Sequence, residues 1–186
     1  DAAADDLSVD REHGVLVLPV DQHHGALGER ALEHGVAGGL VDGAAQPAAV
    51  IHLTIPCNEM MTAFGPAVGE LMSVLAAQGV EPVGAVFAHH FRMPTDSFDF
   101  ELGVKVTAPV AAAGRVRPGE LPAARVARAT YTGSYDGLGN AWGELIGWVE
   151  AGNHKQGTDF WELYSVVPQS TPDTNAWQTE LTRPLV

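Results

Sequence analysis

The sequence contains few of the residues on which several protein classes depend. Its one cysteine, Cys57, excludes an intrachain disulfide, and we therefore expect a reducing, cytoplasmic location. Only 10 Lys and Arg side chains stand against 23 Asp and Glu, which gives a net charge of −13. A chain this acidic is a poor partner for nucleic acid or an anionic membrane, because both carry dense negative charge. No uninterrupted apolar run reaches the roughly 18 residues of a membrane span.

The sequence also lacks the short motifs of common cofactor sites and active sites. It contains no phosphate-binding loop, dinucleotide-binding fingerprint or nucleophile elbow. The neighbours His89 and His90 point to opposite faces of an expected strand, and no third ligand follows at metal-binding spacing. We therefore expect neither a metal nor another cofactor. Residues 1–13 are acidic and small, unlike the basic and apolar regions of a signal peptide.

From residue 48 onward, the spacing of apolar residues predicts regular secondary structure. Residues 98–106 alternate between apolar and polar side chains, which is typical of a half-buried strand. Gly65-Pro66 marks the start of an expected helix and Gly79 its end. The expected strands cover residues 48–55, 85–93, 98–106, 124–131, 159–167 and 176–184, and the expected helices cover residues 65–79 and 138–151.

This order of elements, strand–helix–strand–strand, occurs twice. The segment Gly69-Glu70-Leu71 recurs as Gly143-Glu144-Leu145, at an offset of 74 residues, and Glu101-Leu102 recurs as Glu180-Leu181, at an offset of 79. Two copies at this spacing indicate a duplicated supersecondary unit and not a solenoid.

We therefore predict an α+β fold in which two units, residues 48–110 and 122–186, join edge to edge into one antiparallel sheet. Both helices are expected on one face, with a ligand groove between the units on the opposite face. Residues 111–121 form the linker, in which residues 114–121 are expected to be a short strand or a wide turn.

Residues 1–47 form an N-terminal extension to which the sequence assigns no role. Val15–Val20 is expected to be a strand and Ala26–His34 a short helix, whereas the glycines of residues 38–43 indicate a flexible passage. We expect the extension to pack on the main domain or to exchange with another subunit, in a monomer or a homodimer.

Residues 159–167 carry the strongest chemical signal. Six of the nine are aromatic or branched aliphatic, which predicts a strand covered on both faces. Alternation places Phe160, Glu162 and Tyr164 on one face and Trp161 on the other, where we expect Trp161 to pack under a helix. A carboxylate buried among aromatic rings is costly without a partner, so Glu162 is the main functional candidate. The alternatives are an ion pair with an Arg or a strand edge that faces water.

Other candidates surround Glu162 in the predicted fold. In the repeat Ala88 corresponds to Glu162, so His90 shares its face, where a neutral imidazole assists proton transfer or is simply structural. Tyr164 stacks, donates a hydrogen bond or packs in the core. Tyr131 and Tyr135 flank a Gly-Ser turn and either line the groove or cap the turn. The candidate ligand-binding residues are Glu162, Tyr164, Phe160, Tyr131, Tyr135, His90 and His52, and the candidate catalytic residues, if the protein is an enzyme, are Glu162, Tyr164 and His90.

Several segments resemble one known family. Tyr131–Trp142, Phe160–Tyr164 and Trp177–Leu181, in this order, resemble the GyrI-like family, the small-molecule-binding domain of AraC- and MerR-type regulators. The first copy is similar through Gly65-Pro66 and Phe98–Gly103. The resemblance begins near residue 48 and continues to the last residue. The preceding extension shows no helix-turn-helix, so we expect a standalone member.

The resemblance implies a duplicated α+β sheet with a central groove into which the Glu at the position of Glu162 reaches. In drug-sensing members this Glu attracts cationic, aromatic compounds, and some standalone members look like hydrolases that open cyclopropane rings. We therefore expect a protein that binds a hydrophobic, aromatic or cationic small molecule, such as a drug or natural product. The alternatives are an enzyme, either a hydrolase or a cyclase or isomerase, that uses Glu162 as acid or base, and a module that binds or inhibits another protein.

Overall fold

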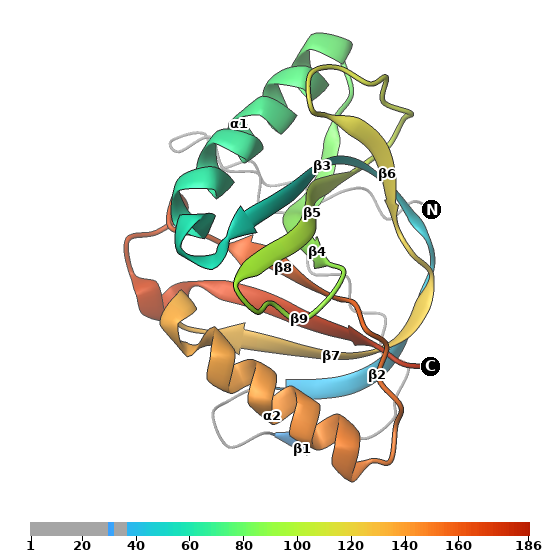
Figure 1. Ribbon diagram of the computed structural model, residues 1–186, viewed down its shortest axis with the longest axis vertical. Helices are drawn as coiled ribbons and strands as arrows, with labels where there is room; N and C mark the ends of the chain where they lie inside the picture. The colour runs from blue at the N-terminus through green and yellow to red at the C-terminus, as the bar shows by residue number, and fades with distance from the viewer. Residues whose placement is uncertain (1–29, 32–36) are drawn as a thin grey trace, which may run out of the picture.

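Two long helices lie on one face of a nine-stranded sheet in which every pair of neighbouring strands is antiparallel (Figure 1). This computed structural model describes residues 30–31 and 37–186. The strands are β1 (Arg30–Ala31), β2 (Ala37–Gly43), β3 (Gln46–Pro56), β4 (Pro82–His90), β5 (Ser97–Val106), β6 (Arg117–Leu121), β7 (Ala124–Thr132), β8 (Phe160–Val166) and β9 (Gln178–Pro184). The helices are α1 (Met60–Gln78) and α2 (Leu138–Ala151), and the 3-10 turns are η1 (Cys57–Glu59), η2 (Tyr135–Gly137) and η3 (Thr174–Ala176).

The predicted duplication is confirmed. One unit is β3-α1-β4-β5 and the other is β7-α2-β8-β9, and the two meet where β4 pairs with β8. The strand order across the sheet is β1-β2-β7-β9-β8-β4-β5-β3-β6. At the junction between the units, Ala88 lies directly opposite Glu162.

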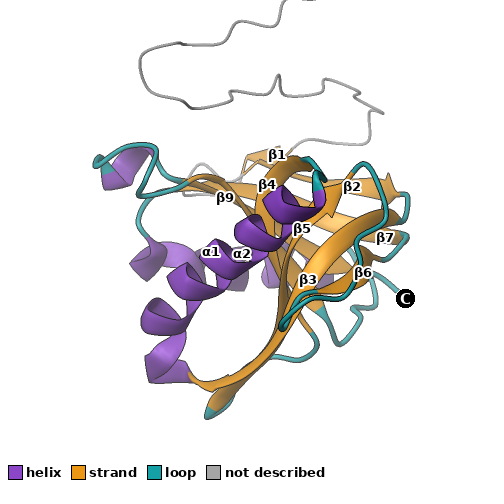
Figure 2. Ribbon diagram, turned by 90° about the horizontal axis from the view of Figure 1, so that it is seen from above, coloured by secondary structure: helices purple, strands orange, loops and turns teal. Residues whose placement is uncertain are grey.

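In each unit, the sheet is extended by a strand from the segment that precedes the other unit in the chain. β2 comes just before β3 in the chain but pairs with β7, and β6 comes just before β7 but pairs with β3. Only Ala44 and Ala45 connect β2 to β3, and only Pro122 and Ala123 connect β6 to β7. In the sheet, however, β7, β9, β8, β4 and β5 lie between β2 and β3. Connections this short hold the end of β2 next to the start of β3 and the end of β6 next to the start of β7, so the sheet curls, as Figure 2 shows.

The inner face of the curl is packed too closely for side chains at two glycines. A Cβ atom added to Gly103 would lie 2.5 Å from Cζ of Phe87, and one added to Gly119 would lie 2.7 Å from Cγ2 of Val50. Phe87 and Val50 form a core on the helix-free face together with Trp161. The glycines therefore let neighbouring strands carry large side chains across the curl.

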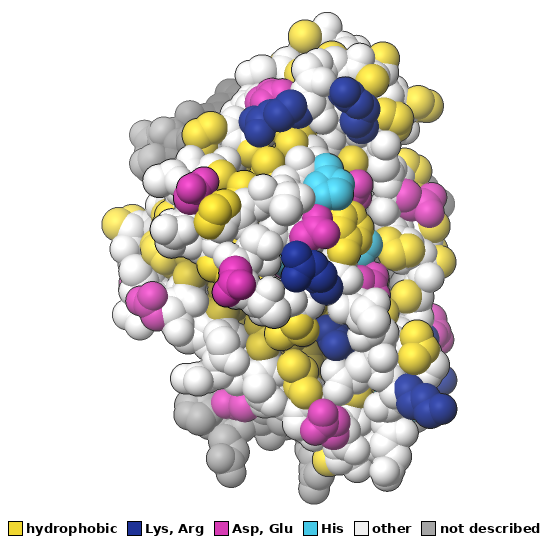
Figure 3. Space-filling view, viewed as in Figure 1, with side chains coloured by type: hydrophobic (Ala, Val, Ile, Leu, Met, Phe, Trp, Pro, Cys, Tyr) yellow, Lys and Arg dark blue, Asp and Glu magenta, His cyan; other side chains and the backbone are white. Residues whose placement is uncertain are grey.

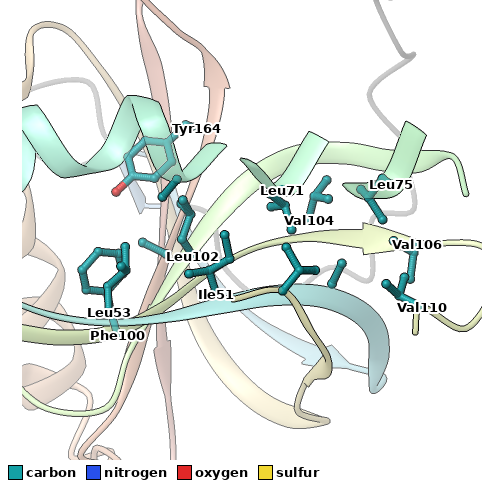
Figure 4. Close-up of a cluster of buried hydrophobic side chains, with 14 residues drawn as sticks. Ile51, Leu53, Leu71, Leu75, Phe100, Leu102, Val104, Val106, Val110 and Tyr164 are labelled. Carbon is teal, nitrogen blue, oxygen red and sulfur yellow. The ribbon is translucent and has the colours of Figure 1, made fainter. Parts of the chain in front are cut away.

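The helix-covered face holds two further cores, one under each helix. Under α1, Leu71 and Leu75 pack on Ile51, Leu102 and Val104, as Figure 4 shows. Under α2, Trp142 and Leu145 pack on Phe160 and Leu181. Burying a side chain of the size of Leu contributes about 1.5–3 kcal/mol, so these contacts fix both helices on the same face.

The segment Cys57–Gln78 is long and apolar enough to cross a membrane by length and composition alone. Its buried residues are Ala67, Leu71 and Leu75, which recur with helical spacing and face the sheet. In this fold the segment is therefore one layer of the α+β domain.

Three expectations for secondary structure are wrong. The passage expected to be flexible contains β2, whose pairing with β7 outweighs the weak strand propensity of its glycines. Arg30 and Ala31 lie in β1 and not in a helix. α1 begins at Met60, so Pro66 lies inside the helix and does not start it. The expected strand Val15–Val20 lies outside the described residues.

Candidate functional site

Glu162 lies at the centre of the sheet, in β8, and two side chains hold its carboxylate. The indole N–H of Trp142 donates to Oε1 at 2.7 Å, and the hydroxyl of Tyr164 donates to Oε2 at 2.7 Å. Only 8% of Glu162 is exposed. Both oxygens therefore have partners, but these partners are neutral.

The direction of Glu162 follows from its neighbours across the sheet. Its cross-strand partners Ala88 and Leu181 belong to the two cores under the helices, so Glu162 points toward the helices. Glu162 was expected on the opposite, helix-free face, so the predicted direction of its side chain is wrong. Trp161 was expected under a helix but packs on the helix-free face with Phe87 and Val126.

The electrostatic environment of Glu162 is unusual for a buried carboxylate. Burial raises its pKa, and the hydrogen bonds from Trp142 and Tyr164 lower it in part. Within the part of the chain that the structure describes, no Lys, Arg or His side chain forms an ion pair with Glu162. The ion pair with Arg that was the alternative interpretation is therefore not formed among these residues.

Aromatic rings from separate elements gather around Tyr164. The ring of Phe64 in α1 meets that of Tyr164 edge to face, with 5.2 Å between centroids. Tyr135 in η2 contacts Tyr164 at 6.0 Å, and Trp177, just before β9, packs on Tyr135 at 5.0 Å. Burial and the charge of Glu162 raise the pKa of Tyr135. The carboxylate is thus flanked by aromatic surface.

His90 lies on the same face, between two parallel rings. Phe160 stacks on it with 4.6 Å between centroids and Phe100 with 5.1 Å. Burial, followed by the neighbouring His89, lowers the pKa of His90 to about 4, so its ring is neutral at pH 7. Among the described residues, its buried Nδ1 has no hydrogen-bond partner, and neither has the buried hydroxyl of Thr179, which lies opposite Tyr164.

Comparison with known proteins agrees with this architecture. The sequence profile of the GyrI-like small molecule binding domain matches residues 40–185. The chain belongs to the GyrI-like family. No curated protein matches the sequence.

Several solved structures share this fold at low sequence identity. The EcmrR C-terminal domain has a TM-score of 0.73 at 19% identity, over 81% of this chain and 98% of that chain. A hydrolase from Listeria innocua has a TM-score of 0.62 at 10% identity, over 80% and 91%. SAV2435 bound to tetraphenylphosphonium has a TM-score of 0.59 at 11% identity, over 80% and 93%. This chain spans 57% of the EcmrR chain in its DNA complex.

Two residues of the candidate set lie apart from the carboxylate in this GyrI-like domain. The hydroxyl of Tyr131 donates to the backbone oxygen of Ser134 at 2.9 Å, so Tyr131 caps the turn before α2. His52 lies exposed on the helix-free face, with its Nε2 2.8 Å from Oδ1 of Asp99. The other five candidates, Glu162, Tyr164, Phe160, Tyr135 and His90, lie together on the helix-covered face.

The sequence interpretation missed three residues of the site. Trp142 was assigned only to the apolar face of a helix. A buried indole needs an acceptor for its N–H, and a buried carboxylate such as Glu162 needs a donor, so the two could have been paired. Phe64 lies in the part of α1 that was not expected to be helical. Trp177 was expected in the strand over residues 176–184 and belongs to the family resemblance, but it was given no role in the site; it lies just before β9 and packs on Tyr135.

The visible face of the domain carries no strong electrostatic signal. On the face shown in Figure 3, acidic and basic side chains are scattered among apolar ones, with no large patch of one charge. Among the described residues, no group of three or more His, Cys, Asp or Glu side chains is arranged to hold a metal ion. The aromatic cluster around Glu162 is therefore the feature of this family member on which a function is best argued.

Proposed function

We propose that this protein binds a small lipophilic cation with aromatic groups and that Glu162 supplies the opposite charge. One observation carries this proposal: the carboxylate is buried, and within the described residues its hydrogen-bond donors, Trp142 and Tyr164, are neutral. A charge without a counterion in a poorly hydrated site attracts a cation strongly. Phe64, Tyr135 and Trp177 add ring faces that favour cationic ligands.

The ligand reaches Glu162 through the aromatic cluster. Because only 8% of Glu162 is exposed, the rings above it must move before a ligand contacts the carboxylate. Tyr135 and Trp177 are only partly buried and lie in a 3-10 turn and a loop. Such segments open at lower free energy than strands and helices, so we place the entrance there.

A charge-matched pair of ligands tests this proposal. Methyltriphenylphosphonium and triphenylphosphine oxide have similar shapes, but only the first is charged. In Glu162→Gln, affinity for the phosphonium should fall by about 1–3 kcal/mol, the scale of a charge-assisted contact, while affinity for the oxide changes little. Glu150→Gln, an exposed change on α2, is the control. Equal affinities of Glu162→Gln and the parent protein for the phosphonium, by calorimetry, would contradict the proposal.

A second candidate is an enzyme in which Glu162 acts as acid or base. The raised pKa of Glu162 supports it, because a carboxyl that keeps its proton nearer neutral pH is a better general acid. The reaction class is hydrolysis, such as opening of a strained ring in a hydrophobic natural product, or its cyclisation or isomerisation. In that case Glu162→Gln should lower turnover by about 10²–10⁴ with binding unchanged. Neither candidate function needs a cofactor. The free thiol of Cys57 is compatible with a cytoplasmic location.

A further inference from the structure

A pocket of about 260 Å³ lies on the helix-free face of the sheet, on the far side from the carboxylate of Glu162. It is located where the connections β2–β3 and β6–β7 cross, because Gly43, Ala44, Leu121 and Pro122 form part of its wall. Its size is just below the range of roughly 300–1,000 Å³ that is usual for small-molecule sites. The curl of the sheet thus creates a concave site apart from Glu162.

The inner wall of this pocket is apolar. Trp161 and Leu163 extend into it from β8, and Leu121 and Val126 face them from the strands that meet across the curl. Because side chains alternate along a strand, Trp161 and Leu163 lie on the face opposite to Glu162 and Tyr164. A ligand in this pocket therefore does not touch the carboxylate of Glu162.

The polar wall of the pocket favours an anion, whereas the Glu162 site favours a cation. Nε of Arg128 lies 3.4 Å from Oε1 of Glu180, and Lys105 also lines the pocket. Burial raises the pKa of Glu180, whereas the positive charges of Arg128 and Lys105 lower it, so both cations act on this one carboxylate. Two cations and one carboxylate among the lining residues leave one positive charge uncompensated.

We propose that this pocket is a second ligand site, for a small hydrophobic monocarboxylate. The carboxylate pairs with Arg128 and Lys105, and the carbon skeleton lies on Trp161 and Leu163. A guanidinium and an ammonium group offer several N–H donors to one anion, and an aromatic wall supplies the apolar contact that a flat hydrocarbon needs. The residues of this pocket differ from those of the proposed cation site, so each proposal can be tested independently of the other.

A naphthalene probe pair tests the chemistry of the site. 1-Naphthoate carries the expected negative charge, whereas 1-naphthamide has nearly the same shape and none. By calorimetry, naphthoate should bind with saturation and at least about tenfold more tightly than naphthamide, because charge-assisted contacts are lost in the amide. Arg128→Gln and Lys105→Gln should each weaken naphthoate binding about tenfold. Equal binding of both probes, or no saturable binding of naphthoate, would overturn the proposal.

Substitutions at two adjacent alanines test where the probe binds without changing any charged residue. Ala44 lines the pocket, whereas Ala45, the next residue of the same exposed connection, does not. Ala44→Trp should therefore abolish naphthoate binding, while Ala45→Trp and Glu162→Gln retain it. If Ala44→Trp binds naphthoate normally, or if Glu162→Gln alone removes binding, the probe lies elsewhere and the proposal is wrong.

Discussion

The two repeated units place different side chains at matching positions around the junction between them. Ala88 of the first unit lies opposite Glu162 of the second, and the same offset of 74 residues relates Val68 to Trp142. It also relates His90 to Tyr164. The first unit therefore has an apolar residue in place of the carboxylate and another in place of one of its two donors.

Elsewhere the units are alike, since Leu71 and Leu145 are both fully buried under their helices. The fold thus depends on apolar positions that the units share, and the candidate chemistry depends on a few positions that they do not share. The junction has room for one buried charge only, because directly opposed residues of antiparallel strands have Cβ atoms about 4.5–5.5 Å apart. A carboxylate in both units would bring two like charges together in a poorly hydrated environment.

A second carboxylate at Ala88, the counterpart of Glu162 in the first unit, should have the largest effect on the free energy of unfolding. Ala88 is fully buried, so Ala88→Gln should cost about 1–3 kcal/mol of unfolding free energy through overpacking. Ala88→Glu should cost a further 3–5 kcal/mol or so at pH 7, because it adds an unpaired buried charge beside Glu162. Urea denaturation of both variants measures the difference, which should shrink as the pH falls and the carboxyls become protonated. Equal stabilities of the two variants at pH 7 would show that the junction tolerates a second charge.

The counterpart of Tyr164, His90, should make the fold sensitive to acid. Its pKa is about 4 in the folded protein against 6.5 for an ordinary His. The neutral ring is favoured in the fold, so this contribution is complete above pH 6.5 and is lost as the pH falls toward 4. The loss amounts to about 3 kcal/mol at most. His90→Phe keeps a ring between Phe100 and Phe160 and should flatten this part of the stability–pH curve, whereas His154→Gln should not. A curve for His90→Phe that is parallel to that of the parent protein would contradict the assignment.

The sequence predicted the parts of the fold that are periodic and local. The offset between the copies gave both units and the face shared by the helices, and alternation gave the common side of Phe160, Glu162 and Tyr164. β2 was missed because its glycines carry no strand signal and its partner, β7, begins about 80 residues later in the chain. The same long-range pairing decides the curl of the sheet, which no local pattern encodes.

The missed parts of the site have the same origin. Whether Glu162 points toward the helices or away from them depends on which side of the sheet α1 and α2 cover, and alternation along β8 is identical in both cases. Trp142 is 20 residues from Glu162 in the sequence, and its apolar neighbours on α2 made it look like an ordinary core residue. Tyr131 and Tyr135 flank the same turn, and only the packed structure shows that Tyr131 caps it while Tyr135 reaches Tyr164.

The difference between Val68 and Trp142 leads to the prediction with the smallest expected effect. Trp142→Phe keeps an aromatic ring in the second unit but removes the N–H group that donates to Oε1 of Glu162. In this respect the variant resembles the first unit, where Val68 has no N–H group in its side chain. Loss of a hydrogen bond to a buried charged group should lower the unfolding free energy by about 1.5–3 kcal/mol at pH 7. This hydrogen bond lowers the pKa of Glu162, so that pKa should rise further in the variant.

The pH dependence separates this effect from simple loss of packing. A folded-state pKa above the unfolded value makes the native state less stable as the pH rises through it, so the deficit of Trp142→Phe should be largest at neutral pH. It should diminish in acid, where Glu162 carries its proton. Trp148→Phe, on the same helix but only partly buried and contacting His154, is the matched control. If both Trp variants lose the same stability at every pH between 4 and 8, the indole of Trp142 acts only through packing, and the carboxylate of Glu162 does not depend on it.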